Sequence, residues 1–336
     1  MLAAFHRNCI RSSEAAAKYF ILGALSSGML LFGISLIYGF TGSFDFQQIQ
    51  AVVNAQELVH PGFIVGMVFV LASMAFKISA VPFHMWAPDV YEGSPTSVTL
   101  FFAVVPKVAA LTVFIRFLYV PFVNLIDQWQ MIIIFLSLAS MIFGAVAAIG
   151  QKNLKRLIAY SSIGHMGYAL AGLAVGTNSG IQNSIIYICI YLIMNLGVFC
   201  CLFMMKRNDQ FFDNMEDLSG LSKNHPIISL SLLVLLFSLA GIPPMAGFFA
   251  KFYIFISVIE ESMYFLAIIG LISTVVSAFY YLRIIKIIYF DPPKEKFDQV
   301  NYFGLKISLA ISTLLILLYF IYPSGLINLV SKINII

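Results

Sequence analysis

Residues 76–99 read FKISAVPFHMWAPDVYEGSPTSVT, and they follow a long apolar run that begins at Phe63. Lys77 therefore lies near the inner end of a hydrophobic segment. Pro82 disturbs a helix at this point because it lacks an amide hydrogen and crowds the carbonyl of Ile78. A charged residue at the centre of a bilayer costs at least about 2.5–3.5 kcal/mol, so Lys77 is a candidate functional residue. The alternative is a lysine whose stem lies in lipid while its ammonium reaches the headgroups.

The whole chain has the composition of an integral membrane protein. Of its 336 residues, 61% are hydrophobic and only 10% are charged, against a charged share of roughly 25% in soluble proteins. Apolar runs repeatedly reach the roughly 20 residues that a helix needs to cross a bilayer. We therefore predict an all-α fold, a polytopic transmembrane helical bundle of about nine helices in a single membrane domain. The expected spans are 16–40, 62–84, 95–119, 129–150, 154–176, 181–205, 226–256, 263–290 and 305–330.

Lysine and arginine fall on alternate connections between these spans, and the intervening connections carry acidic residues instead. Under the positive-inside rule, the basic connections lie in the cytoplasm. We therefore expect the start of the chain in the cytoplasm and the C-terminus outside. The basic residues concerned are Arg7, Arg11, Lys152, Lys155, Arg156, Lys206, Arg207, Lys223, Lys294 and Lys296.

Two of the expected spans are interrupted. The span 226–256 is too long for one straight crossing and contains Gly241, Pro243 and Pro244, so we predict two half-helices joined by unwound backbone. The span 62–84 is disturbed in the same way by Pro82. Because the two broken spans run in opposite directions, they indicate antiporter-like inverted repeats, the usual plan of ion carriers.

Several classes of function are excluded by the motifs. The four cysteines show no metal-ligand spacing, and the chain has neither a G-x-G-x-x-G sequence after a strand nor a Walker sequence. No basic cluster is interleaved with aromatic residues, so nucleic acid is not an expected partner. The chain is therefore expected to bind no cofactor or metal of its own.

Three lysines are candidates for proton transfer: Lys77, Lys107 and Lys251. A buried lysine can exchange between its neutral and charged forms, whereas an arginine cannot be deprotonated in a protein. Lys18 and Lys286 lie near the cytoplasmic ends of their spans, and there we prefer the snorkelling interpretation.

Two histidines extend this set. His84 follows Lys77 by two helical turns if the helix continues past Pro82, and it could relay protons or cap the helix end. His165 lies in the middle of a span, so we expect it to act as a proton relay.

Other polar side chains have structural interpretations. The fifth expected span places Ser161, Ser162 and Tyr168 on the face of His165. The sixth expected span carries Asn183, Tyr187, Tyr191 and Asn195, for which hydrogen bonds between helices are the simpler interpretation.

The acidic residues near the expected cytoplasmic ends also have structural interpretations. Glu14 is expected to pair with Lys18, four residues later. Asp89 and Glu92 lie in an expected cytoplasmic turn, where we predict that they are solvated or contact a partner protein.

Three stretches resemble one known family. They are the opening stretch, QKNLKRLIAYSSIGHMGYALAGL at 151–173 and SLAGIPPMAGFFAKFYIF at 238–255. Together they are similar to subunit N of proton-pumping NADH:quinone oxidoreductase, the antiporter-like membrane subunit of respiratory complex I. The resemblance runs essentially end to end.

The resemblance implies roles for particular residues. In the family, a lysine of the first broken helix pairs with a glutamate two helices earlier, and Lys77 matches that lysine. Lys107 matches the central connecting lysine, and Lys251 matches the lysine of the second broken helix. His84 and His165 match histidines of the proton path.

The resemblance also implies a division of the chain and its surroundings. Residues 1–125 would be the remainder of the first inverted repeat, 126–290 the second repeat and 291–336 the C-terminal helix. Other membrane-arm subunits of complex I and the lipid bilayer would be the partners, while NADH, FMN, iron-sulfur clusters and quinone would be bound by other subunits. A bacterial inner membrane is favoured over a mitochondrial one.

The chain also departs from the family pattern. Family members usually have about fourteen helices, and MLAAF before His6 looks like the end of a helix. The chain is therefore expected to correspond to the C-terminal two thirds of a subunit, without the glutamate partner of Lys77. Two further interpretations stay open: a subunit of a multisubunit sodium/proton antiporter or membrane-bound hydrogenase, and a structural remnant that only scaffolds the membrane arm.

Overall fold

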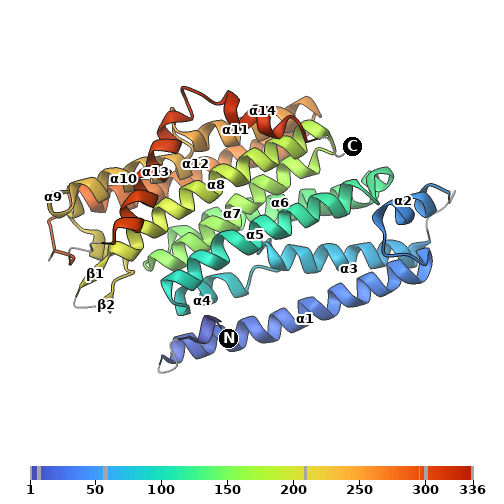
Figure 1. Ribbon diagram of the computed structural model, residues 1–336, viewed down its shortest axis with the longest axis horizontal. Coiled ribbons are helices and arrows are strands. Elements are labelled where there is room, and N and C mark those ends of the chain that lie inside the picture. The colour runs from blue at the N-terminus through green and yellow to red at the C-terminus, as the bar shows by residue number, and fades with distance from the viewer. Residues whose placement is uncertain are drawn as a thin grey trace.

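The computed structural model describes residues 2–5, 9–55, 60–207, 210–294, 296–298 and 302–333. Its helices run roughly side by side in an elongated bundle, and a short hairpin of two strands lies at one end (Figure 1). The predicted all-α transmembrane bundle is thus confirmed. The elements are η1 (Leu2–Ala4), α1 (Ile10–Thr41), α2 (Phe46–Ala55), α3 (Pro61–Lys77), α4 (Trp86–Gly93), α5 (Thr96–Tyr119), η2 (Val123–Leu125), α6 (Ile126–Ile149), α7 (Leu154–Ala174), α8 (Asn178–Met204), β1 (Lys206–Arg207), β2 (Gln210–Phe211), η3 (Met215–Leu218), α9 (Leu221–Asn224), α10 (Pro226–Ala240), α11 (Ala246–Glu260), α12 (Tyr264–Phe290), α13 (Phe303–Leu318) and α14 (Ser324–Val330).

Most helices correspond to the expected spans with small shifts of their boundaries. The expected span 305–330 is wrong as a single helix, because residues 319–323 are not helical and divide it into α13 and α14. Among the residues that the structure describes, five segments are long and apolar enough to cross a membrane: α1, α5, η2 with α6, α8 and α12. Shorter apolar helices at α3, α10 and α13 account for further expected spans, and α7 (Leu154–Ala174) occupies the expected span 154–176. The division of the chain into repeats at residues 125 and 290 stays a prediction.

Both expected breaks are present. The first break separates α3 from α4: α3 ends at Lys77, residues 78–85 are not helical, and Ser79 has a positive φ of 59°. The prediction that depended on a helix continuing past Pro82 is therefore wrong, and His84 lies in the connection. The second break separates α10 from α11, where Gly241 ends α10 with a φ of 86°.

α7 is the central helix, and nearly all of its side chains are buried. It lies against α6 at very short range, because a Cβ atom on Gly144 would come within 2.5 Å of the amide nitrogen of Gly164. Small residues allow such close backbone approach in membrane proteins. α7 is thus fixed between its neighbours, and its polar side chains must find partners on them.

The connections that carry the basic residues meet at one end of the bundle, where Figure 1 shows the hairpin and α9. Backbone hydrogen bonds join them: for example, the amide of Met215 donates to the carbonyl of Lys152, that of Lys294 to Ser219, and that of Asp298 to Lys206. α2 lies at the opposite end of the bundle (Figure 1). This arrangement agrees with a single cytoplasmic face at the hairpin end.

Candidate functional site

Lys107 lies in the interior of α5, directly after Pro106, and its side chain is fully buried. Its ammonium donates a hydrogen bond of 2.7 Å to the hydroxyl of Ser162 on α7, and it lies 5.6 Å from the ring centre of Tyr91 on α4. Among the residues that the structure describes, no carboxylate forms an ion pair with Lys107. The ammonium is therefore held by a neutral hydroxyl and an aromatic face.

Lys251 lies in the second turn of α11 and is also buried. Its ammonium donates to the carbonyls of Leu239 and Ala240, both at 3.2 Å. These carbonyls belong to the last turn of α10, where unpaired carbonyl groups and the helix dipole favour a positive charge. The break in the helix thus supplies the acceptors for the lysine.

Gly241 leaves space for the side chain of Lys251. Its φ of 86° is in the left-handed region, which favours glycine. A Cβ atom at this position would lie 3.1 Å from Cδ and 3.3 Å from Nζ of Lys251. The glycine in the break therefore has both a backbone role and a packing role.

His165 on α7 lies between two tyrosines from different helices. Its Nδ1 is 2.6 Å from the hydroxyl of Tyr187 on α8, and its Nε2 is 3.1 Å from the hydroxyl of Tyr281 on α12. Tyr281 also bonds to the hydroxyl of Ser161. Because a neutral imidazole has one donor and one acceptor nitrogen, either tautomer can be satisfied here.

A small cavity of about 10 Å³ joins His165 to Lys251, and Ser161 and Tyr168 are among the residues that line it. This volume is near the minimum that can hold one water molecule. The ring of Tyr168 also lies 4.9 Å from the ammonium of Lys251. On another side, Lys251 borders an apolar cavity of about 280 Å³.

α7 therefore connects three of the five residues predicted for proton transfer, namely Lys107, His165 and Lys251. Ser162 contacts Lys107, and His165, three residues later on the same helix, shares a cavity with Lys251. We call Lys107, His165 and Lys251 the polar row. Its members come from α5, α7 and α11.

Lys77 lies outside the polar row. It is half-buried and lines a groove of about 370 Å³ together with Ala16, Tyr19 and Gly23 of α1. Its ammonium lies 5.9 Å from the ring centre of Phe76. Within the described ranges, no acidic side chain pairs with Lys77.

His84 is likewise separate from the polar row. Its ring lies 4.4 Å from that of Phe143 on α6, and its Nδ1 is buried without a hydrogen-bond partner. Where the chain is described, no hydrogen bond joins His84 to Lys77 or to the polar row. The relay role of His84 stays a prediction.

The acidic residues of α4 differ from expectation. Asp89 and Glu92 were expected to be solvated or to contact a partner, but both accept hydrogen bonds from Arg156 on α7. Lys18 pairs with Asp89 as well as with Glu14, so snorkelling is not its only role. The predicted pair of Glu14 and Lys18 is present.

Two further predictions about polar residues have clear outcomes. Asn183 donates to the carbonyl of Tyr253 on α11 at 3.0 Å, which confirms the structural interpretation of that residue. Lys286 forms an ion pair with Asp291 at the end of α12. Tyr91 and Tyr281 were not predicted to contact the site. Tyr281 and its partner His165 are 116 residues apart, and Tyr91 reaches Lys107 from the neighbouring helix α4.

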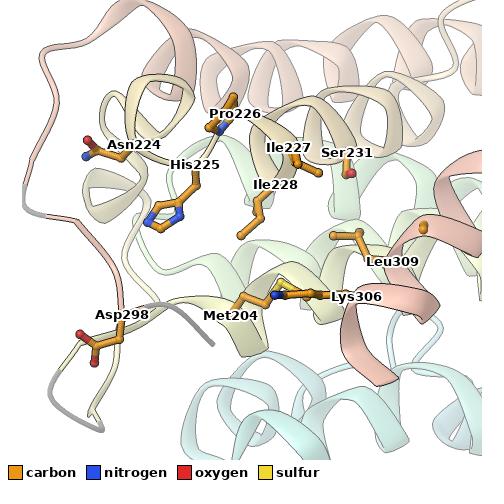
Figure 2. Close-up of a pocket in the computed structure, with 11 residues that line it drawn as sticks. Met204, Asn224, His225, Pro226, Ile227, Ile228, Ser231, Asp298, Lys306 and Leu309 are labelled. Atoms are coloured by element: carbon orange, nitrogen blue, oxygen red, sulfur yellow. The ribbon is translucent and has the colours of Figure 1, made fainter. Parts of the chain in front are cut away.

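A larger cavity lies elsewhere. It has a volume of about 530 Å³ and lies between the start of α10 and the start of α13, as Figure 2 shows with His225 and Lys306. Ile228 and Leu309 are among its apolar lining residues. None of the five predicted residues lines it, so its size does not identify the candidate site.

Comparisons with known proteins agree on one family. The description "NADH:quinone oxidoreductase/Mrp antiporter, TM" matches residues 1–277. NADH-quinone oxidoreductase subunit N of Pelagibacter ubique is 70% identical over the whole chain, which covers 71% of that relative. Subunit N of Parvibaculum lavamentivorans is 55% identical over 97% of the chain and 68% of the relative.

Solved structures share the fold. A chain of respiratory complex I from Thermus thermophilus has a TM-score of 0.80 and 30% identity, with 97% of this chain and 70% of that chain covered. A chain of the Mrp complex from Dietzia has a TM-score of 0.85 over 96% of this chain and 68% of that chain. At 21% identity, this second likeness shows the fold alone.

Proposed function

The chain belongs to the transmembrane family of NADH:quinone oxidoreductase and Mrp antiporter subunits, and from this premise we propose that protons move through it along the polar row. It is a membrane-arm subunit of the proton-translocating NADH:quinone oxidoreductase and lies in the bacterial inner membrane. The proposal concerns which of its residues carry the proton.

The observation that carries the proposal is the environment of the two buried lysines. Lys107 is held by a hydroxyl and Lys251 by two carbonyls, and no described carboxylate fixes either ammonium as an ion pair. Such groups accept hydrogen bonds from the ammonium, but they carry no full charge that would prevent its deprotonation. Each lysine can therefore release and regain a proton.

His165 supplies the step between the lysines. A proton taken up at one ring nitrogen can be released from the other, and both nitrogens of His165 already have a tyrosine hydroxyl as partner. The small cavity shared with Lys251 provides the continuation on one side. On the other side, Ser162 lies one helical turn before His165 and contacts Lys107.

Lys77 is proposed as the further titrating site, at the groove beside α1. Its half-buried ammonium and the break directly after it allow a group on a neighbouring protein segment to approach. We propose that the other membrane-arm subunits transmit charge displacement to this chain. NADH, FMN, iron-sulfur clusters and quinone are proposed to be bound by other subunits.

The test uses the assembled complex in membrane vesicles. Lys107→Met should lower the number of protons moved per NADH oxidised, because Met fills the space but carries no proton. The matched control is Lys286→Met, since Lys286 lies on α12 at the membrane boundary and pairs only with Asp291 among the described residues. An unchanged ratio for Lys107→Met would refute the proposal.

The same assay separates the two alternatives. A sodium/proton antiporter function predicts that proton movement depends on the sodium gradient, whereas the proposal predicts dependence on NADH oxidation alone. A structural remnant predicts that variants of the polar row leave the proton-to-NADH ratio unchanged as long as the complex assembles.

A further inference from the structure

α4 is a short helix between two of the proposed proton-carrying lysines. At its start, the indole nitrogen of Trp86 donates to the carbonyl of Phe76, next to Lys77, at 2.9 Å. Near its end, directly before Glu92, Tyr91 is fully buried. Its ring centre lies 5.6 Å from the ammonium of Lys107. The position of α4 therefore decides what surrounds Lys107.

An ion network holds α4 against two other helices. One guanidinium nitrogen of Arg156 on α7 donates to Asp89 at 2.8 Å and to Glu92 at 2.9 Å. On the side of α1, Lys18 donates to Asp89 at 2.6 Å, and Arg11 lies 3.6 Å from Glu92. The two acids are three residues apart on one helix face, where like charges repel unless cations lie between them.

The C-terminal end of α4 is fixed as well. Lys155 on α7 donates to the carbonyl of Ser94 at 3.3 Å and pairs with Asp213 at 3.2 Å. The backbone of α4 lies directly on α1, because a Cβ atom on Gly93 would come within 2.5 Å of the carbonyl oxygen of Arg11. α4 is thus held by charges from α7 and α1 and by close packing on α1.

We propose that the network of Asp89, Glu92 and Arg156 positions α4, and with it Tyr91, against Lys107. Arg156 is then a positioning residue for proton transfer: it touches neither lysine and acts through α4. Its planar guanidinium can bridge the two carboxylates in a fixed geometry, which a lysine cannot reproduce fully. Partly exposed ion pairs add little stability. The main consequence of this network is therefore the orientation of α4 and Tyr91.

The inference rests on the proposed role of Lys107, and its test uses the same assembled complex. Arg156→Gln should lower the proton-to-NADH ratio to the value of Lys107→Met, while the complex still assembles and oxidises NADH. Arg156→Lys keeps one positive charge and should restore part of the ratio. The matched control is Arg283→Gln, because Arg283 donates to the carbonyl of Ile149 on α6 and to no acidic residue that the structure describes.

A second variant covers the case in which Arg156→Gln fails to assemble. Asp89→Asn removes one charge and leaves the bond between Arg156 and Glu92, so it should lower the ratio in part. A ratio for Arg156→Gln or Asp89→Asn equal to that of Arg283→Gln would overturn the inference. If Lys107→Met lowers the ratio in the same preparations, the proposed function stands and only the positioning role fails.

Discussion

The two broken helices carry a lysine each, but they surround it differently. In the second break, Lys251 follows the interruption and its ammonium caps the carbonyls that end α10. In the first break, Lys77 is the last residue of α3, and its ammonium lies at a groove beside α1. The first lysine is half-buried, and the second is only 4% exposed.

The two lysines thus show that a lysine at a helix break can find its partners within its own chain or remain open to a group outside it. At the second break, carbonyl groups of the same chain accept hydrogen bonds from Lys251. Its partners therefore do not depend on neighbouring subunits or lipid. The first break leaves Lys77 without an acidic partner among the described residues, so its charge depends on what lies in the groove. We therefore expect substitutions in the two breaks to have unequal effects.

The largest expected effect concerns the lysines themselves. Lys251→Ala should slow proton transfer along the polar row by about 100-fold, the lower end for a positioned acid–base group. Lys77→Ala should also reduce proton pumping, but by less. Both are measured as the rate of proton uptake into vesicles during NADH oxidation. Unchanged pumping in Lys77→Ala would exclude a role for that lysine, and an equal loss in both variants would contradict the difference between the breaks.

The next effect concerns the glycine of the second break. Gly241→Ala places a side chain at a φ of 86° and against Lys251. The left-handed conformation alone costs about 1–2 kcal/mol. We expect a lower midpoint of thermal inactivation and reduced pumping. Gly28→Ala on α1 is the control, since the added Cβ atom meets no atom within 4 Å outside the neighbouring backbone of its own helix, and it should lower neither value.

A smaller effect is expected for the first break. Trp86→Phe removes the hydrogen bond that ties α4 to the carbonyl of Phe76, and the loss should destabilise the subunit by about 1–2 kcal/mol. The measurement is again the midpoint of thermal inactivation of the purified complex. An unchanged midpoint would mean that α3 and α4 are held together without this bond.

Much of the fold could be predicted from the sequence, because apolar runs and prolines act locally. The positions of the two breaks followed from Pro82 and from Gly241 with its neighbouring prolines. The position of His84 could not be predicted in this way. Only the structure shows that α3 ends at Lys77 and that residues 78–85 are not helical.

Only the titratable residues of the candidate site could be predicted from the sequence, and their hydrogen-bond partners could not. Lys107, His165 and Lys251 were identified because titratable residues are rare inside apolar spans. Their partners are contributed by distant helices, as Tyr281 on α12 is for His165. The network at α4 was missed for the same reason: Asp89 and Arg156 are 67 residues apart, and no local pattern joins them.

Lys251→Arg decides whether the polar row carries protons. Arginine keeps the positive charge and can still donate to the carbonyls at the end of α10, but it cannot release a proton. We expect the proton-to-NADH ratio of Lys251→Arg to stay as low as that of Lys251→Ala in the assembled complex. A ratio restored to that of the unmodified protein would show that Lys251 supplies only a fixed charge, and it would contradict proton transfer through Lys251.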